Sequence, residues 1–405
     1  MNVVAMNYSK YESYKDSGVG WLGEIPSDWK LGRISAFFSE RRQKVSDKDY
    51  PPLSVTKLGV FPQWENVAKS NDGDNRKLVK KGDFVINSRS DRKGSSGIAK
   101  QDGSVSLINI VLKPVDIEPR YSEYLFKSYN FIEEFYRVGH GIVADLWTTR
   151  FDDIKNSMIA LPSLDVQTKI ANFLDEKTAQ IDQAIALKQQ QIDKLNEYKQ
   201  IVIQNAVTKG LNSNALMKDS GVEWIGEIPQ HWEVKKLKYI GKIKNGMDYK
   251  HVEAESGYPV IGSGGQFTFA SKYIYDGEAV LLGRKGTIDK PLYINDKFWT
   301  VDTMFYCICK RLYSTKFIYY CAITIPFHYY STATALPSMT QSDLNNHKFA
   351  MPSLSEQIEI VDYLETTIAK FDKVSQKYQT QIDRLKEYKN ILINQAVTGK
   401  IKIDS

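Results

Sequence analysis

Two acidic residues and a lysine stand close together in the run from Asp83 to Lys93. Carboxylates such as Asp83 and Asp91 can hold a magnesium ion, and an ion held in this way can activate water to hydrolyse a phosphodiester bond. The same run also contains Arg92, and its surroundings are rich in basic residues. We therefore favour a simpler interpretation, in which this segment is a basic loop that contacts DNA.

Two arginines follow runs that are typical of β-strands. Arg89 follows DFVINS after Gly82, and Arg284 follows EAVLLG after Gly277, which pairs the two segments at an offset of 195 residues. An arginine at a strand end can reach guanine O6 and N7 with two hydrogen bonds, while neighbouring lysines and loop amides hold phosphates. A solvated surface turn is the alternative. With the polar loops at 147–150 and 263–266, the candidate DNA-binding residues are Arg89, Arg92, Lys93, Trp147, Arg150, Ser263, Gln266, Arg284 and Lys285.

Motifs for catalysis or cofactor binding are not found. The run Gly283–Thr287 lacks the spacing of a phosphate-binding Walker loop, and Asp49–Leu53 has the wrong order for an amino-methyltransferase motif and no accompanying dinucleotide-binding glycines. Cys307, Cys309 and Cys321 have no neighbours that complete a four-ligand zinc site, so we interpret them as buried thiols on a strand. We expect no catalytic residue, cofactor or metal in this chain.

Composition and length describe an ordinary globular protein of more than one domain. The chain has 405 residues, of which 42% are hydrophobic and 25% charged, and its net charge is +6. Basic residues cluster between Arg76 and Lys100 and again between Lys235 and Lys250, which fits an anionic partner. The most apolar stretch, Phe317–Tyr330, is too short to span a membrane, and we expect a cytoplasmic protein.

Two segments of the sequence are each present in two similar copies. DSGVGWLGEIPSDW, from Asp16, returns as DSGVEWIGEIPQHW from Asp219, at an offset of 203 residues. The 50-residue segment from Leu161 returns from Met351, at an offset of 190 residues. The segments between these repeats differ in length and sequence. The order is therefore variable segment, repeat, variable segment, repeat.

Each repeated tail is predicted to be one long helix with a single apolar stripe. Neither tail contains Pro or Gly between its opening proline and a closing glycine, Gly210 or Gly399. About 40 residues at 1.5 Å each give a rod near 60 Å, and a stripe on such a rod needs a partner. We expect the two duplicated helices to pair antiparallel about a pseudo-two-fold axis, with the globular segments at opposite ends, whereas separate docking of each stripe on its own domain is the alternative. The pairing residues would be Ile170, Leu174, Ile181, Ile185, Ile192, Leu195 and Val202 with Ile360, Leu364, Phe371, Ile382, Leu385 and Leu392.

The fold class expected is α+β, with two globular β-rich domains, each followed by a long helix, and the helices forming an antiparallel coiled coil. Strands are predicted at Lys81–Asn87, Gly103–Pro114, Glu278–Leu282 and Phe298–Cys309, and short helices at Tyr121–Tyr136 and Ser314–Thr324. The expected boundaries are 1–160 and 211–350 for the two globular domains, and 161–210 and 351–405 for the two helices.

The duplicated motifs resemble those of Type I restriction-modification specificity subunits. The resemblance rests on GEIP-x-x-W at Gly23–Trp29 and Gly226–Trp232, on the LPSL and MPSL segments, and on the endings LNEYKQIVIQNAVTKG and LKEYKNILINQAVTGK. It covers nearly the whole chain. One departure is Val166 before Gln167, where the second copy has Glu356 before Gln357.

The resemblance implies a non-catalytic, sequence-specific DNA-binding subunit with two target-recognition domains for an asymmetric, bipartite target. It implies two modification subunits that bind S-adenosylmethionine and methylate adenine, and two restriction subunits that can join and use ATP and magnesium. The alternatives are an autonomous nuclease or methyltransferase, which would cleave or methylate DNA alone, and a structural coiled-coil linker, which would show no sequence preference.

Overall fold

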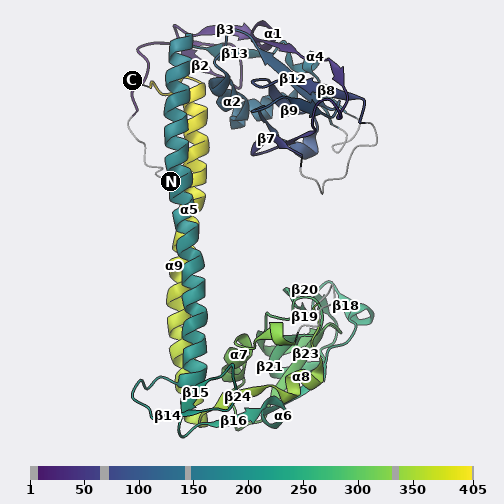
Figure 1. Ribbon diagram of the computed structural model, residues 1–405, viewed down its shortest axis with the longest axis vertical. Coiled ribbons are helices and arrows are strands. Elements are labelled where there is room, and N and C mark those ends of the chain that lie inside the picture. The colour runs from purple at the N-terminus through teal and green to yellow at the C-terminus, as the bar shows by residue number, and fades with distance from the viewer. Residues whose placement is uncertain (1–7, 64–72, 142–146, 331–336, 404–405) are drawn as a thin grey trace. The chain divides into compact units, whose positions relative to one another are not determined.

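The computed structural model describes residues 8–63, 73–141, 147–330 and 337–403 (Figure 1). The chain divides into two compact units, one formed by Met1–Lys188 with Thr380–Ser405 and the other by Gln189–Gln379. Both long helices contribute to both units, so each unit contains one globular domain and a section of each helix. Within the described ranges, no helix is long and apolar enough to cross a membrane.

The first globular domain is built from short strands in several small sheets. The largest sheet has the order β10-β9-β12-β4, and a second has the order β11-β8-β5. The paired strands β3 and β13 join the start of the domain to its end. The strands are β1 (Tyr14–Asp16), β2 (Glu24–Pro26), β3 (Lys30–Arg33), β4 (Phe38–Glu40), β5 (Lys44–Val45), β6 (Leu53–Thr56), β7 (Gly59–Pro62), β8 (Arg76–Val79), β9 (Phe84–Asn87), β10 (Ser96–Ile98), β11 (Gly103–Val105), β12 (Asn109–Pro114) and β13 (Met158–Leu161). The helices are α1 (Ile34–Phe37), the 3-10 turn η1 (Ser90–Arg92), α2 (Pro119–Lys127), α3 (Tyr129–Arg137) and α4 (Phe151–Ile154).

The second globular domain repeats this plan around a larger sheet, with the order β17-β23-β21-β22-β19-β20-β18. Its strands are β14 (Met217–Asp219), β15 (Glu227–Pro229), β16 (Glu233–Lys236), β17 (Gly241–Asn245), β18 (Glu253–Ala254), β19 (Tyr258–Gly262), β20 (Gly265–Ala270), β21 (Tyr275–Gly283), β22 (Leu292–Thr300), β23 (Met304–Cys309) and β24 (Lys348–Met351). Its helices are α6 (Leu237–Ile240), η3 (Lys250–Val252), α7 (Thr315–Ile323), η4 (Phe327–Tyr329) and α8 (Gln341–Asn346). The β16–β24 pair takes the place of β3–β13.

The long helices α5 (Leu164–Lys209) and α9 (Leu354–Val397) pair antiparallel in each unit (Figure 1). In the first unit Asp182 Oδ2 lies 2.6 Å from Lys389 Nζ, and Lys188 Nζ donates to Gln381 at 2.6 Å, so the partner residue number falls as the α5 number rises. In the second unit Lys199 Nζ lies 2.8 Å from Asp372 Oδ1. These contacts confirm the predicted antiparallel pairing. Every residue of the predicted apolar stripe is buried or half-buried.

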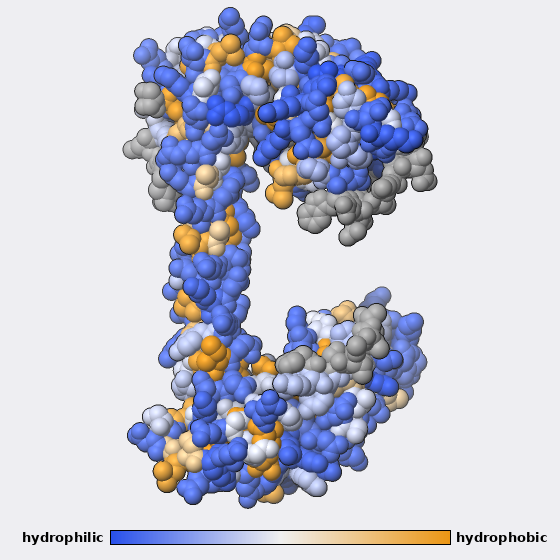
Figure 2. Space-filling view, viewed as in Figure 1, coloured by the Kyte–Doolittle hydropathy of each residue, from blue (hydrophilic) through white to orange (hydrophobic). Residues whose placement is uncertain are grey.

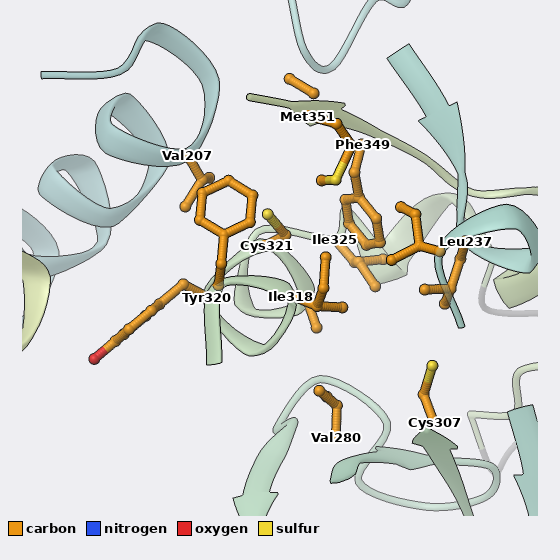
Figure 3. Packing of buried hydrophobic residues seen from close by; sticks show 14 of the residues in the cluster. Val207, Leu237, Val280, Cys307, Ile318, Tyr320, Cys321, Ile325, Phe349 and Met351 are labelled. Carbon is orange, nitrogen blue, oxygen red and sulfur yellow. The ribbon is translucent and has the colours of Figure 1, made fainter. Parts of the chain in front are cut away.

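The hydrophobic cores are shared between globular domains and helices. In the first unit, Ile170 and Leu174 of α5 and Leu392 of α9 join the cluster around Trp29 and Phe126. In the second unit, Figure 3 shows Val207 of α5 facing Cys321 of α7, with Phe349 and Met351 of β24 in the same cluster. Because the stripe packs on both a partner helix and a domain, pairing and separate docking occur together.

The repeated GEIP-x-x-W segments pack against the glycines that follow the carboxyl ends of the long helices. Gly399, with φ +72°, follows α9, and a Cβ there would lie 2.4 Å from Pro26 Cδ. Gly210, with φ +73°, follows α5, and a Cβ there would lie 3.1 Å from Trp232 Cζ2. A left-handed residue without a side chain is required at each helix end, which explains why the repeat closes on glycine.

Several predicted elements differ in detail from the structure. The run 121–136 is two helices rather than one, because Ser128 is extended and its hydroxyl both donates to Leu125 O and accepts from Phe131 N. The run 103–114 is two strands that pair with different partners, β8 and β9. Cys307 and Cys309 lie on β23 as predicted, but Cys321 lies on α7, so the prediction of a strand was wrong for that thiol.

Candidate nucleic-acid interface

The acid pair near Arg89 is engaged in structural contacts. Arg41 Nε and Nη2 donate to the Asp83 carboxylate at 2.7 and 3.1 Å, and Lys80 N donates to it at 2.8 Å. The hydrogen bond to Asp83 raises the pKa of Arg41. Asp91 is exposed, 3.6 Å from Arg92. Among the described residues no group of three or more His, Cys, Asp or Glu could hold a metal ion. Both Asp83 oxygens accept hydrogen bonds, so Asp83 has a structural role in this domain, and the interpretation of the segment as a DNA-contacting loop stays a prediction.

Two candidate segments of the first domain lie side by side. Ser90 N donates to Trp147 O at 3.1 Å, and Thr149 N donates to Ser88 O at 3.0 Å. Arg89 forms an isolated antiparallel bridge with Thr148 between these two bonds. The loop after β9 and the segment before α4 therefore form one small ribbon, although they are far apart in the sequence.

The side chains of this ribbon differ in their exposure and in the contacts that they make. Arg89, Arg92 and Arg150 are exposed. Lys93 Nζ lies 2.7 Å from Glu133 Oε2 and 5.9 Å from the centroid of the Tyr136 ring, so part of its charge is neutralised. Trp147 is half-buried and its indole N–H donates to the Tyr136 carbonyl at 2.8 Å, which fixes the segment in place. The three arginines are thus the groups best placed to reach a ligand.

A hollow of about 480 Å³ adjoins the ribbon. Ser88, Thr149 and Arg150 line one side of it, while Arg42 and Lys44 enter from beyond β4. Arg42 and Lys44 were not among the predicted DNA-binding residues, because they lie outside the basic clusters at 76–100 and 235–250. The signal that could have found them is the run Arg41-Arg42-Gln43-Lys44.

The second domain builds the same ribbon with different side chains. Gly286 N donates to Pro337 O at 2.9 Å, Met339 N donates to Arg284 O at 3.0 Å, and Lys285 bridges to Ser338 between them. By this hydrogen-bond pattern Lys285 takes the place of Arg89, and Arg284 takes the place of Ser88. The pairing of Arg89 with Arg284 was therefore wrong by one residue, because the strand register, which the spacing of glycines does not determine, sets the equivalence.

Arg284 and Lys285 differ in their contacts. Arg284 Nη1 donates to Asp302 O at 3.3 Å, and its guanidinium carbon lies 5.8 Å from the centroid of the Phe305 ring. Lys285 is exposed. Arg284 is therefore partly held against the β22–β23 turn, whereas Lys285 projects from the same position as Arg89.

Ser263 and Gln266 lie at the β19–β20 hairpin. Ser263 is half-buried in the turn, and Gln266 is exposed next to Phe267, whose side chain is 54% exposed. Thr300 Oγ1 donates to Ile261 O at 2.9 Å, which joins the hairpin to the end of β22. The hairpin contacts Thr300, and Arg284 contacts Asp302. Both candidate segments therefore adjoin residues 300–303.

The chain matches the family described as "Type I restriction modification DNA specificity domain" over residues 26–197 and 229–384. It is 24% identical over 452 residues to the Type I restriction enzyme MjaVIII specificity subunit of Methanocaldococcus jannaschii, with 99% of each chain covered. It is 23% identical over 425 residues to the Type I restriction enzyme EcoDI specificity subunit of Escherichia coli, with 94% of this chain and 90% of that protein covered.

Two solved structures share the fold. One was solved in work on the "complex assembly" and "conformational transition of the type I R-M system"; its TM-score is 0.70 at 14% identity, with 92% of this chain and 98% of that chain covered. The other is the HsdS subunit from Thermoanaerobacter tengcongensis, with a TM-score of 0.52 at 15% identity and coverage of 93% and 98%. The family match spans both globular domains and most of both long helices, and the chain belongs to the Type I restriction modification DNA specificity domain family.

Proposed function

We propose that this chain is the non-catalytic, DNA sequence-recognition subunit of a Type I restriction-modification complex. The observation that carries the proposal is the ribbon built twice from the same backbone hydrogen bonds, which presents exposed cations in one domain at Arg89 and in the other at Lys285. Because the side chains of the two ribbons differ, each domain reads its own half of the target. The target is therefore asymmetric and bipartite.

Within each half, arginine and glutamine side chains read base edges. Arg89, Arg92 and Arg150 can each donate two hydrogen bonds to guanine, and Gln266 can make two with adenine. Lys93, Ser263, Arg284 and Lys285 contact phosphates or neighbouring bases, whereas Trp147 positions the ribbon. We assign residues 1–160 and 211–350 to the two target-recognition domains, and residues 161–210 and 351–405 to the two repeated segments that contain α5 and α9.

The chemistry belongs to partner subunits. Two modification subunits bring S-adenosylmethionine, and two restriction subunits can join with ATP and magnesium, all in the cytoplasm. The paired helices, held together by the apolar stripe, set the separation of the two half-sites and offer the surface on which the modification subunits dock. The exposed surface of the helices is largely hydrophilic on the face that Figure 2 shows.

The test is a survey of methylated motifs in a host that carries this chain as its only specificity subunit. We expect one split motif for the wild type. Arg89→Ala should relax one half of that motif at a cost of about 1 to 3 kcal/mol, and Lys285→Ala should leave that half unchanged. Cleavage or methylation by the purified chain alone, or methylation without a motif, would overturn the proposal.

A further inference from the structure

A second basic surface lies in the second domain, along the edge strand β17. A groove of about 550 Å³ runs beside this strand and is lined by Lys238, Lys242 and Lys310 together with Gln341 and Asn345. The ribbon that carries Arg284 and Lys285 does not line it. Two lysines of the second basic cluster of the sequence, Lys238 and Lys242, line the groove, and neither belongs to the ribbon.

Three elements bring the lysines together. Lys242 lies on β17, where buried Ile243 separates it from Lys244 on the same exposed face. Lys310 follows β23, which pairs with β17, and its backbone N donates to Ile240 O at 2.9 Å. Gln341 of α8 donates from Nε2 to Ile243 O at 2.9 Å, which holds α8 against the strand. Helices α6 and α8 are neighbours in Figure 1, so Lys238 of α6 faces the same groove.

These lysines are not neutralised within the described part of the protein. Lys238, Lys242, Lys244 and Lys310 are exposed and make no ion pair there, and no acidic residue lines the groove. The two preceding lysines behave differently. Lys235 lies 2.9 Å from Glu233, and Lys236 donates to Asn346 at 3.2 Å.

Lysines on an edge strand can simply prevent strands of different molecules from pairing. The first domain argues against that explanation here. Its edge strand β4 carries Ser39 at the position of Lys242, and Arg41 follows at the position of Lys244 but is bound to Asp83. Ser35 and Val115 take the places of Lys238 and Lys310. The same edge exists in both domains, yet within the ranges that the structure describes the β4 edge has no row of lysines to match that of β17.

We propose that this lysine groove binds the sugar–phosphate backbone of duplex DNA, outside the base-reading ribbon. Lys242 and Lys244 are two residues apart on one face of a strand, a spacing of about 6.8 Å, so their ammonium groups can reach different phosphates of one DNA strand. Lysine is a compact cation that suits phosphate and carries little sequence information. The groove therefore adds affinity, not specificity. This inference rests on the proposed function.

The experiment compares two triple variants of the full chain, each assembled with the modification subunits of its host. One is Lys238→Gln, Lys242→Gln and Lys310→Gln. The control, Lys10→Gln, Lys30→Gln and Lys218→Gln, removes the same charge from exposed positions outside the paired helices and both reading ribbons. Dissociation constants are measured for a target duplex and a scrambled duplex between about 50 and 200 mM salt.

Each phosphate contact contributes about 0.9 to the slope of log K against log salt, so the groove variant should lower that slope by about 2 to 3. Affinities for target and scrambled DNA should fall by the same factor, and the control should keep the wild-type slope. An unchanged salt slope in the groove variant, with target preference retained, would contradict phosphate binding by the groove but not the proposed function. If the groove variant loses only its preference for the target duplex, the groove reads bases. If the variant fails to assemble, the groove contacts a partner protein. Either result would contradict the proposal. If the wild type itself shows no target preference, the proposed function fails first.

Discussion

A single residue difference between the two copies leaves one tryptophan indole N–H without a hydrogen-bond acceptor among the described residues. Trp232 Nε1 donates to Glu356 Oε1 at 3.0 Å at the start of α9. Trp29 occupies the same place in the first unit, but its buried indole N–H has no acceptor among the described residues, because Val166 stands where the second copy has glutamate. A buried donor without an acceptor costs about 1 to 3 kcal/mol. The sequence revealed the departure at Val166, but only the fold connects it to Trp29.

We predict that Val166→Gln raises the free energy of unfolding of the first unit by about 1 kcal/mol, since the amide oxygen can accept from Trp29. Val166→Glu should gain less, because a carboxylate there would lie near Asp28, where the second copy has His231 bonded to Glu356. Val166→Leu is the control without an acceptor. In the second unit Glu356→Val should lose about 1 to 3 kcal/mol and Glu356→Gln much less. Chemical denaturation measures all of these variants, and equal stability of Val166→Gln and Val166→Leu would contradict the account.

Another residue-scale prediction concerns pH. His347 is buried beside Trp224 and accepts from or donates to the Tyr330 hydroxyl through Nδ1 at 2.8 Å, and burial lowers its pKa to about 4 from 6.5. The unfolded chain therefore binds the proton more readily, and the stabilisation present above pH 6.5 is lost as the pH falls towards 4. The loss should be on the order of 1 to 3 kcal/mol. His347→Gln, which can still accept from Tyr330, should flatten this dependence of the unfolding midpoint, whereas exposed His251→Gln should not. A wild-type slope in His347→Gln would refute the assignment.

At the scale of elements, regular patterns in the sequence predicted the structure well and irregular ones did not. The long helices follow from the spacing of apolar residues and from the absence of Pro and Gly, and the structure has them at 164–209 and 354–397. The candidate site was harder, because Arg89 and Trp147 meet through backbone bonds between loops that no periodicity links. The equivalence of Arg89 with Lys285 depends on strand register, which one inserted residue shifts.

The helix stripe gives a prediction at this scale. Ile192 and Leu195 are half-buried on α5, and replacing both with aspartate should lower stability by about 2 to 4 kcal/mol through lost burial and uncompensated charge. Gln190→Asp with Gln191→Asp is the matched control, because both positions are exposed on the same helix and each replacement lowers helix propensity and adds one negative charge. The melting temperature decides the matter. A midpoint as high in the Ile192 and Leu195 double variant as in the control would mean that these side chains do not hold the helices together.

At the scale of the whole molecule, the two units differ in where the chain is continuous. In the second unit α5 runs on through Gly210 and the 211–216 segment into β14. In the first unit α9 ends at Val397, and beyond Gly399 Lys402 N donates to Ser9 O at 2.7 Å. Ser9 and Lys402 both correspond to Asn212 when the two repeats are aligned. Ser9 and Lys402 thus meet where the second unit has an unbroken connection.

This arrangement predicts that a circular permutant of the chain should fold. A permuted chain that begins at Ser213, joins Lys402 to Ser9 through a short flexible linker and ends at Asn212 should fold, because Lys402 N already donates to Ser9 O and the new ends fall on exposed residues. A control permuted between Gln189 and Gln190 interrupts α5 itself and should be much less stable, since it breaks the hydrogen bonds of a continuous helix. Circular dichroism, melting temperature and the methylated motif of the host compare the two chains. The first permutant should keep the wild-type motif, because neither reading ribbon and neither helix is cut. If both permutants melt equally early, the contact between Ser9 and Lys402 is no substitute for a peptide connection, and the two units are less alike than their hydrogen bonds indicate.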